Sequence, residues 1–166
     1  MRRLKAVKVS SSSLQAAPGK VSSLGVVLDF LRLLWAVDHG LNSISKRMKQ
    51  TMGVTGQQRL VVKLVGRRPG ISAGALAEIL HVHPSTLTGV LRRLVERGAV
   101  ERTQDPADTR RALFRLTRKG RELDAIRTGT VEARVRSALS SMSAEDLVVA
   151  SSVLSRLAHA LSPDKL

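Results

Sequence analysis

The order of elements in residues 55–120 is the strongest constraint that the sequence places on the fold. Apolar side chains recur at three-to-four spacing in three short stretches, which begin near Thr55, Ser72 and Pro84. Two extended segments follow, and they are Ala99–Thr103 and Ala112–Leu116. Three short helices and a hairpin in this order predict a winged helix-turn-helix. The fold class that we expect is mostly α with a small β-hairpin wing.

Longer helices are expected on both sides of this segment. The first begins at about Ser23 and is broken by Met52-Gly53-Val54. Another is capped by Thr117 and reaches about Leu139, and the last opens at Ser143. The first and last helices are too apolar for a single short domain to cover, and exposed apolar patches of that size usually mark interfaces.

These patterns divide the chain into three parts. Residues 55–120 are expected to form the winged helix-turn-helix domain, and residues 23–54 and 121–166 a helical dimerisation region. Residues 1–22 mix Arg and Lys with Ser, Pro and Gly, which predicts a flexible basic N-terminal arm.

The formal net charge of +15 favours a polyanionic partner, because each Lys or Arg that neutralises a phosphate releases condensed counterions. A basic protein without such a partner is the alternative that charge alone leaves open. No apolar run approaches the length of a membrane-spanning helix, no signal peptide opens the chain, and cysteine is absent. We therefore expect a cytoplasmic protein with no membrane partner, no disulfide and no cofactor.

The third short helix has the pattern of a helix that reads the major groove. Leu87, Val90, Leu91 and Leu94 form its buried stripe. Small polar or basic residues lie on or beside the opposite face, where they are free to meet base edges and phosphates. These candidate DNA-binding residues are Ser85, Thr86, Thr88, Gly89, Arg92 and Arg93. An ordinary amphipathic helix is the alternative, and it is weakened by the lack of acidic residues before Glu96.

The loop between the two extended segments packs Asp105, Asp108, Arg110 and Arg111 closely together. An aspartate there can hold one arginine so that another points from the wing tip into a narrow minor groove, where negative potential is highest. Surface ion pairs add little stability, so the pattern indicates positioning. The candidate wing residues are Asp108, Arg110 and Arg111.

The run "PGISAGALAEILHVHPSTLTGVLRRLVERGAVERTQDPADTRRALFRLTRKG", residues 69–120, resembles the MarR family of bacterial regulators. The wing signature from Asp105 to Arg111 is its most specific part, and the likeness extends over about residues 24–162. The resemblance implies a homodimer that binds a pseudo-palindromic operator on double-stranded DNA and regulates transcription, as a repressor. It implies that Arg110 enters the minor groove and that Asp108 is its partner carboxylate. Many members have an arginine where this chain has Gly89.

The resemblance also implies a small phenolic or aromatic effector that loosens DNA binding. Its candidate residues are Trp35, Asp38, His39 and Arg59, although a core Trp35 and a surface His39 are the simpler interpretation. His81 and His83 are only two residues apart and lack a Cys or acidic third ligand, so no metal site is expected. His83 is better explained as a helix cap or a neighbour of the DNA backbone.

Three other functions compete with a ligand-responsive regulator. The first is a DNA-binding or architectural protein that responds to no ligand. The second is an enzyme, but the sequence has no Gly-rich phosphate loop, no nucleophile–base pairing and no metal-ligand cluster, so we expect neither catalytic residues nor an activity. The third is a basic protein-interaction adaptor, which would show no salt-dependent DNA affinity.

Overall fold

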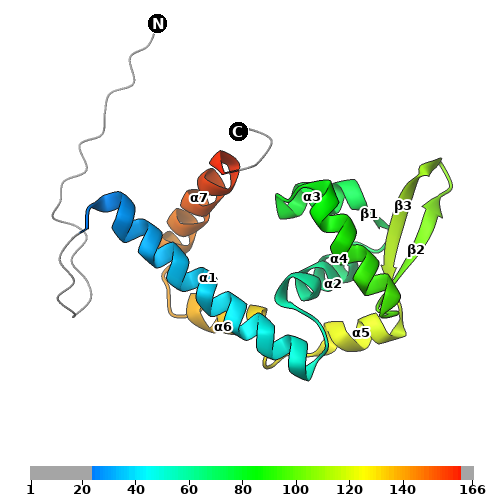
Figure 1. Cartoon of the computed structure of the whole chain (residues 1–166), viewed down its shortest axis with the longest axis horizontal. Coiled ribbons are helices and arrows are strands. Elements are labelled where there is room, and N and C mark those ends of the chain that lie inside the picture. The colour runs from blue at the N-terminus through cyan, green and yellow to red at the C-terminus, as the bar shows by residue number, and fades with distance from the viewer. Residues whose placement is uncertain (1–23, 162–166) are drawn as a thin grey trace, which may run out of the picture. The chain divides into compact units, whose positions relative to one another are not determined.

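The computed structural model describes residues 24–161, which form seven helices and three strands (Figure 1). In chain order these elements are α1 (Val26–Thr51), α2 (Gly56–Arg67), β1 (Ile71–Ser72), α3 (Ala73–Leu80), α4 (Pro84–Glu96), β2 (Val100–Asp105), β3 (Asp108–Leu116), α5 (Arg118–Ala125), α6 (Val131–Leu139) and α7 (Ala144–Ala160). The predicted arm, residues 1–22, lies outside the described residues. The described residues divide into two units, 24–36 and 37–161, and α1 crosses the boundary.

The winged helix-turn-helix that the sequence predicts is confirmed. Helices α2, α3 and α4 pack with an antiparallel sheet of order β1-β3-β2 around one aliphatic core. The core members are Val54, Val61, Val62, Val65, Ile71, Leu76, Ala77, Leu87, Leu91, Leu94, Ala99, Val100, Phe114 and Leu116. The wing is the β2–β3 hairpin that projects beyond this core (Figure 1).

Most helix boundaries follow from local capping chemistry, as predicted. The Thr55 hydroxyl accepts from the backbone N–H of Gln58, whose side chain returns a bond to the Thr55 N–H. Ser72 and Thr117 cap α3 and α5 in the same way, with one bond each. Helix α4 is followed by Gly98 at φ +65°, a backbone conformation that glycine adopts at little cost.

Three predicted details are wrong. The strands are longer than expected and the wing loop shorter, because Asp105 already faces Asp108 across the hairpin. The two-residue strand β1 was missed, since only its pairing with Phe114 and Leu113 defines it. The single helix expected from Thr117 to Leu139 is two helices, because Ile126 is extended and Thr130 starts α6 with a new N-cap.

The outer helices expose much apolar surface. In the part of α1 within residues 24–36, Trp35 is 77% exposed. Other exposed apolar residues there are Val26, Val27, Leu28, Leu31 and Leu33. Separately, α7 exposes Val148, Val149, Val153 and Leu154. Faces of this kind fit the predicted dimerisation region, which remains a prediction. Within residues 24–161, no helix is both long and apolar enough to cross a membrane.

A buried arginine joins the winged helix to the turn between α5 and α6. Arg59 in α2 is 1% exposed, and its Nε donates to Glu132 Oε1 at 2.6 Å. Its terminal nitrogens donate to the backbone carbonyls of Leu123, Asp124 and Ile126. Leu123 and Asp124 lie in the last turn of α5, where helical acceptors lack the usual i+4 partner, and Ile126 is the C-cap residue that follows. Arg59 therefore caps α5 from a position more than sixty residues earlier in the chain.

The start of α6 is held in place by further contacts around Glu132. Burial raises the pKa of Glu132, but bonds from its own backbone N–H and from the Arg59 guanidinium outweigh this, so the net pKa lies below the ordinary glutamate value. Thr130, fully buried, accepts from Ala133 N at 3.2 Å, and Val131 N donates to Met48 Sδ. Because its pKa is lowered, Glu132 is ionised where it contacts Arg59.

Replacing Arg59 is expected to destabilise the fold strongly. Arg59→Met keeps the apolar stem but leaves Glu132 and the Ile126 carbonyl without the guanidinium donor, so we expect a loss of about 3 kcal/mol. The carbonyls of Leu123 and Asp124 keep other donors, such as Ile126 N and Lys63 Nζ. Thermal melting at fixed protein concentration should show a midpoint lower by roughly 6–12 °C for a chain of this size. Arg67→Ala, on the exposed end of the same helix, is the matched control and should change little. An unchanged midpoint in Arg59→Met would contradict the assigned role.

The Glu132 contact should also make stability depend on pH. Because the folded-state pKa is the lower one, the unfolded chain binds more protons, and stability rises with pH through this window. Glu132→Gln should therefore be less stable than the native chain near pH 7. This difference should shrink as pH falls below about 4.3, the ordinary glutamate value. Denaturant melts from pH 7 to 3 would measure it, with the exposed Glu145→Gln as control; a gap that widens in acid would refute the pKa direction.

Candidate nucleic-acid interface

Helix α4 separates a buried face from an exposed one. Leu87, Leu91 and Leu94 are buried in the core, and Val90 packs partly against it. The side chains of five candidate DNA-binding residues are exposed, namely Ser85, Thr86, Thr88, Arg92 and Arg93. A Cβ added to Gly89 would meet no atom within 4 Å, so nothing inside the chain requires glycine there. Close approach of another molecule therefore remains a reason for this residue.

The start of α4 is set by His83 and Pro84. His83 Nδ1 accepts from the backbone N–H of Ser85 at 3.3 Å and lies 2.7 Å from the Ser85 hydroxyl. This confirms His83 as a helix cap. Pro84 occupies the first helical turn, where a missing N–H costs nothing. The Thr88 hydroxyl donates to Pro84 O at 2.8 Å, which leaves its oxygen lone pairs as acceptors facing solvent.

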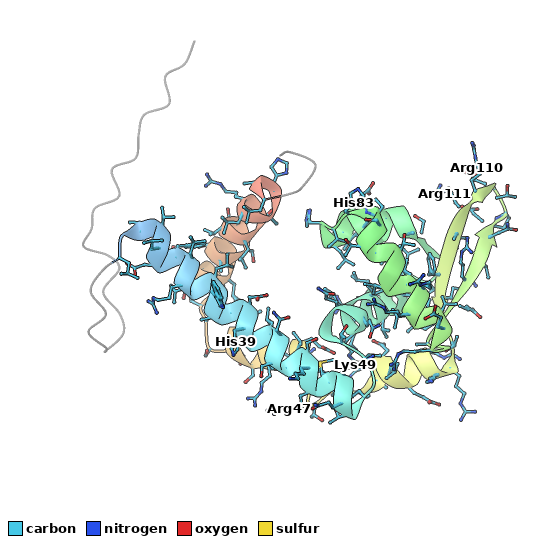
Figure 2. All side chains as sticks on the ribbon, in the orientation of Figure 1. His39, Arg47, Lys49, His83, Arg110 and Arg111 are labelled. Atoms are coloured by element: carbon cyan, nitrogen blue, oxygen red, sulfur yellow. The ribbon has the colours of Figure 1, made fainter. Side chains whose placement is uncertain are left out.

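The wing tip is organised by its two aspartates. Asp108 Oδ1 accepts from the Arg110 backbone N–H at 3.1 Å and lies 3.5 Å from Arg110 Nε. Asp105 instead closes the turn, because its Oδ1 accepts from the backbone N–H of Ala107 at 3.0 Å. Arg110 is 93% exposed, so Asp108 orients its guanidinium without burying it (Figure 2). Asp108 and Arg110 are thus paired, as the resemblance implies, and a groove contact by Arg110 stays a prediction.

Neighbouring cations extend this surface beyond the predicted residues. Side chains alternate along a strand, so Arg110 and Arg111 leave β3 on opposite faces. Arg102 on β2 pairs in register with Phe114 and lies on the face that carries the core residues. Arg102 was not among the predicted residues, which came from the loop, but strand alternation counted forward from the buried Val100 places it on this face.

Of the four candidate effector residues, Trp35 lies in one unit of the chain, and Asp38, His39 and Arg59 lie in the other. In the described part of the chain, the Arg59 guanidinium bonds only to Glu132 and to carbonyls of residues 123–126. Asp38 accepts from the Asn42 side chain at 2.9 Å, and the side chains of Trp35 and His39 are exposed. Arg59 could therefore contact a ligand only by giving up some of these structural bonds.

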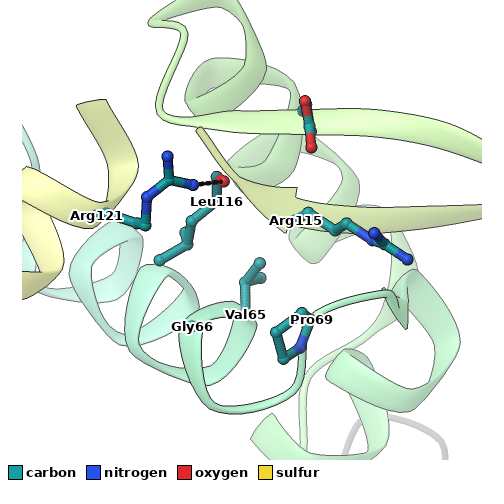
Figure 3. A pocket seen from close by; sticks show the side chains of 7 residues that line it. Val65, Gly66, Pro69, Arg115, Leu116 and Arg121 are labelled. Carbon is teal, nitrogen blue, oxygen red and sulfur yellow. Dashed lines mark hydrogen bonds between the residues drawn. The ribbon is translucent and has the colours of Figure 1, made fainter. Parts of the chain in front are cut away.

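Two hollows lie on the winged domain. One of about 300 Å³ lies between the end of α2 and the base of the wing (Figure 3). Its lining residues are Val65, Gly66, Pro69, Glu101, Arg115, Leu116 and Arg121. The other, of about 130 Å³, is mainly apolar and is lined by Gln57, Leu60, Val61, Leu80, Val82, Thr86, Leu87 and Val90. Thr86 thus belongs both to this hollow and to the candidate DNA-binding face.

Histidines next to the turn before α4 have structural roles. His81 ends α3 in the left-handed region at φ +51°, and its N–H donates to Glu78 O. Within residues 24–161, no group of three His, Cys, Asp or Glu side chains could hold a metal ion.

Residues 54–112 match the MarR family model. The transcriptional regulator HosA of Escherichia coli O111:H- is 37% identical over 70 residues, which are 42% of this chain and 52% of that protein. This chain thus spans about half the length of the curated relatives it matches.

Solved structures extend the likeness to most of the described fold. The Staphylococcus aureus MepR–DNA complex superposes with a TM-score of 0.67 at 20% identity, covering 80% of this chain and 98% of that one. PcaV of Streptomyces coelicolor, solved with its natural ligand, gives a TM-score of 0.68 at 22% identity, covering 84% and 99%. At these identities the superpositions establish the fold. The match to the MarR family model covers residues 54–112, about a third of the chain.

Proposed function

We propose that this protein is a sequence-specific transcriptional regulator that binds double-stranded DNA as a homodimer on a pseudo-palindromic operator. The observation that carries the proposal is the wing tip, where Asp108 orients the exposed Arg110 beside an α4 whose outer face is small, polar and basic. Helix α4 would enter the major groove, and Arg110 the adjacent minor groove. The matching relative HosA is named a transcriptional regulator. A repressor is the simplest form, because a dimer seated on promoter DNA blocks access to it.

The proposed contacts divide into two kinds. Ser85, Thr86 and Thr88 can reach base edges at the start of α4, while Gly89 lets the backbone come close. Arg92, Arg93 and Arg111 supply positive charge for phosphates, which positions the protein without selecting sequence. Arg92 lies 3.6 Å from Glu96, but this exposed pair is weak and can open to a phosphate.

Arg110→Ala tests the wing directly. The variant should bind a duplex selected from genomic fragments about 5- to 150-fold more weakly, or 1–3 kcal/mol, in fluorescence anisotropy at fixed salt. Asp108→Asn keeps an oxygen acceptor for the Arg110 N–H and should lose less. Arg134→Ala on the exposed surface of α6 is the charge-matched control and should bind like the native chain. Native-like affinity of Arg110→Ala would remove the minor-groove contact from the proposal.

The dimer would form through residues 23–54 and 121–166, with residues 55–120 as the DNA-binding domain. Exposed apolar faces on α1 and α7 support this part of the proposal. Two-fold symmetry would then place two copies of α4 about one DNA turn apart.

Light scattering tests the dimer. The native chain should have a mass twice the 18.0 kDa of one copy. Val149→Arg with Leu154→Arg places two charges on the exposed face of α7 and should shift the mass towards one copy. A stable folded monomer of the native chain at micromolar concentration would contradict the dimer. Arg67→Ala, at the exposed end of α2 and outside the proposed dimerisation region, is the control.

A small-molecule effector is a second proposal, supported by the apolar hollow that Thr86 shares with the DNA-binding face. A ligand there would touch Leu60 of α2 and Val90 of α4, so its binding could shift the start of α4. PcaV, which shares the fold, was solved with its natural ligand. Screening small aromatic acids for release of a labelled duplex tests this. A chain whose DNA affinity no such ligand changes would favour the ligand-independent alternative.

A further inference from the structure

Three cations from three helices meet at the turn between α1 and α2. Lys49 Nζ donates to Gly53 O at 3.5 Å. Arg97 lies over the same residue, since a Cβ on Gly53 would be 2.6 Å from Arg97 Nη1. Lys119 Nζ donates to Arg97 O at 2.9 Å. We call Lys49, Arg97 and Lys119 the shoulder cluster.

The charge of the shoulder cluster is only partly balanced within the chain. Helices α1 and α4 both end there, and each C-terminus carries about half a negative charge, which offsets about one of three positive charges. None of the three side chains belongs to any of the ion pairs among residues 24–161. All three are exposed. An excess of about two positive charges therefore faces solvent.

Further cations lie nearby in the sequence, and the two nearby acids, Glu96 and Glu122, are paired with Arg92 and Arg118. Lys46 lies three residues before Lys49 on α1, and Arg93 lies four residues before Arg97 on α4. Like charges at such spacings on a helix destabilise it by a few tenths of a kcal/mol per pair. The chain thus gathers cations here at some cost in stability, which an anionic partner would offset.

The shoulder cluster lies at the end of α4 opposite to the proposed base-reading residues, and Arg93 is the nearest proposed phosphate contact. Ser85 and Arg97 lie at opposite ends of α4, which is roughly 18 Å long at 1.5 Å per residue. In Figure 2, Lys49 lies on the side of the domain away from His83 and from the wing tip with Arg110. One straight duplex seated on the start of α4 and on the wing would therefore not cover the cluster.

We propose that the shoulder cluster binds the phosphate backbone of a second segment of duplex DNA, so that one protein molecule can hold two segments together. This rests on the proposed function, that the chain binds DNA. The three cations are exposed, and neither of the two hollows described above includes them. That arrangement suits a polymer with phosphates in series rather than one enclosed small anion. Recognition is through charge and carries no base specificity.

The test is retention of a second duplex. A biotinylated duplex of the selected sequence is loaded with full-length protein, and capture of a second, fluorescent duplex of unrelated sequence is measured. The variant combines Lys49→Gln, Arg97→Gln and Lys119→Gln, because a glutamine amide can still donate to the local carbonyls. It should retain the second duplex at least tenfold less well, while its affinity for one duplex changes less than threefold. The salt dependence of capture should lose a slope of about 2–3.

A matched control removes three other exposed cations from residues 55–120, Arg67→Gln, Arg68→Gln and Arg115→Gln. It should retain the second duplex normally. Lys49→Gln alone, near the exposed end of α1, keeps the test available should the triple variant melt early, and it should lose capture about threefold.

Several outcomes would overturn the inference. Equal capture by native and shoulder-variant protein would mean that a second winged helix holds the second duplex. Equal losses in the control would mean that overall charge governs capture. Capture of duplex RNA or of polyglutamate in place of DNA would assign the surface to another partner. Binding of one duplex without capture of a second refutes only this inference, whereas binding of none refutes the proposed function.

Discussion

The buried guanidinium of Arg59 is the interaction on which the arrangement of the described fold depends. It lies in α2, at the centre of the winged domain, and its donors are used by the last carbonyls of α5 and by Glu132 at the start of α6. Without Arg59, the turn between α5 and α6 would lose its buried guanidinium donor. Losing one partner of a buried ion pair destabilises a fold far more than losing an exposed pair. The direction in which α6 leaves the winged domain is therefore fixed by a residue of that domain. If the outer helices form the dimer, the same residue helps to set the distance between two copies of α4.

The wing and α4 show the opposite use of charge. Their arginines are exposed, and the ion pair at Asp108 orients Arg110 at little gain in stability. The aliphatic core keeps the two elements rigid relative to each other, because Val100, Phe114 and Leu116 of the wing strands pack with Leu91 and Leu94 of α4 in one cluster. The buried Arg59 thus holds the helices in place, whereas the exposed arginines remain available to bind a partner. The shoulder cluster follows the second pattern on another face of the domain.

The sequence was informative wherever structure is decided locally. N-caps at Thr55, Ser72 and Ser143 depend on the residue and its next three neighbours, so they were predicted correctly. The break between α5 and α6 was not predicted, because a capping group from α2, distant in the chain, stabilises it. Strand β1 was not predicted for the same reason, since only its pairing with β3 makes it a strand. Arg59 shows the limit for sites: a lone cation in an apolar helix has the same sequence signature whether it meets a ligand or a buried carboxylate.

The central claim, that this surface binds the backbone and grooves of duplex DNA, is tested most directly by a salt titration. Fluorescence anisotropy of a labelled genomic fragment with the full-length chain would give the association constant at several salt concentrations. We expect nanomolar-range binding. The logarithm of the association constant should fall linearly with the logarithm of salt concentration, with a slope of about 0.9 per phosphate contacted. We also expect weaker binding to duplexes of unrelated sequence. Absence of binding, or an affinity that salt does not change, would contradict the account and favour an adaptor that recognises another protein.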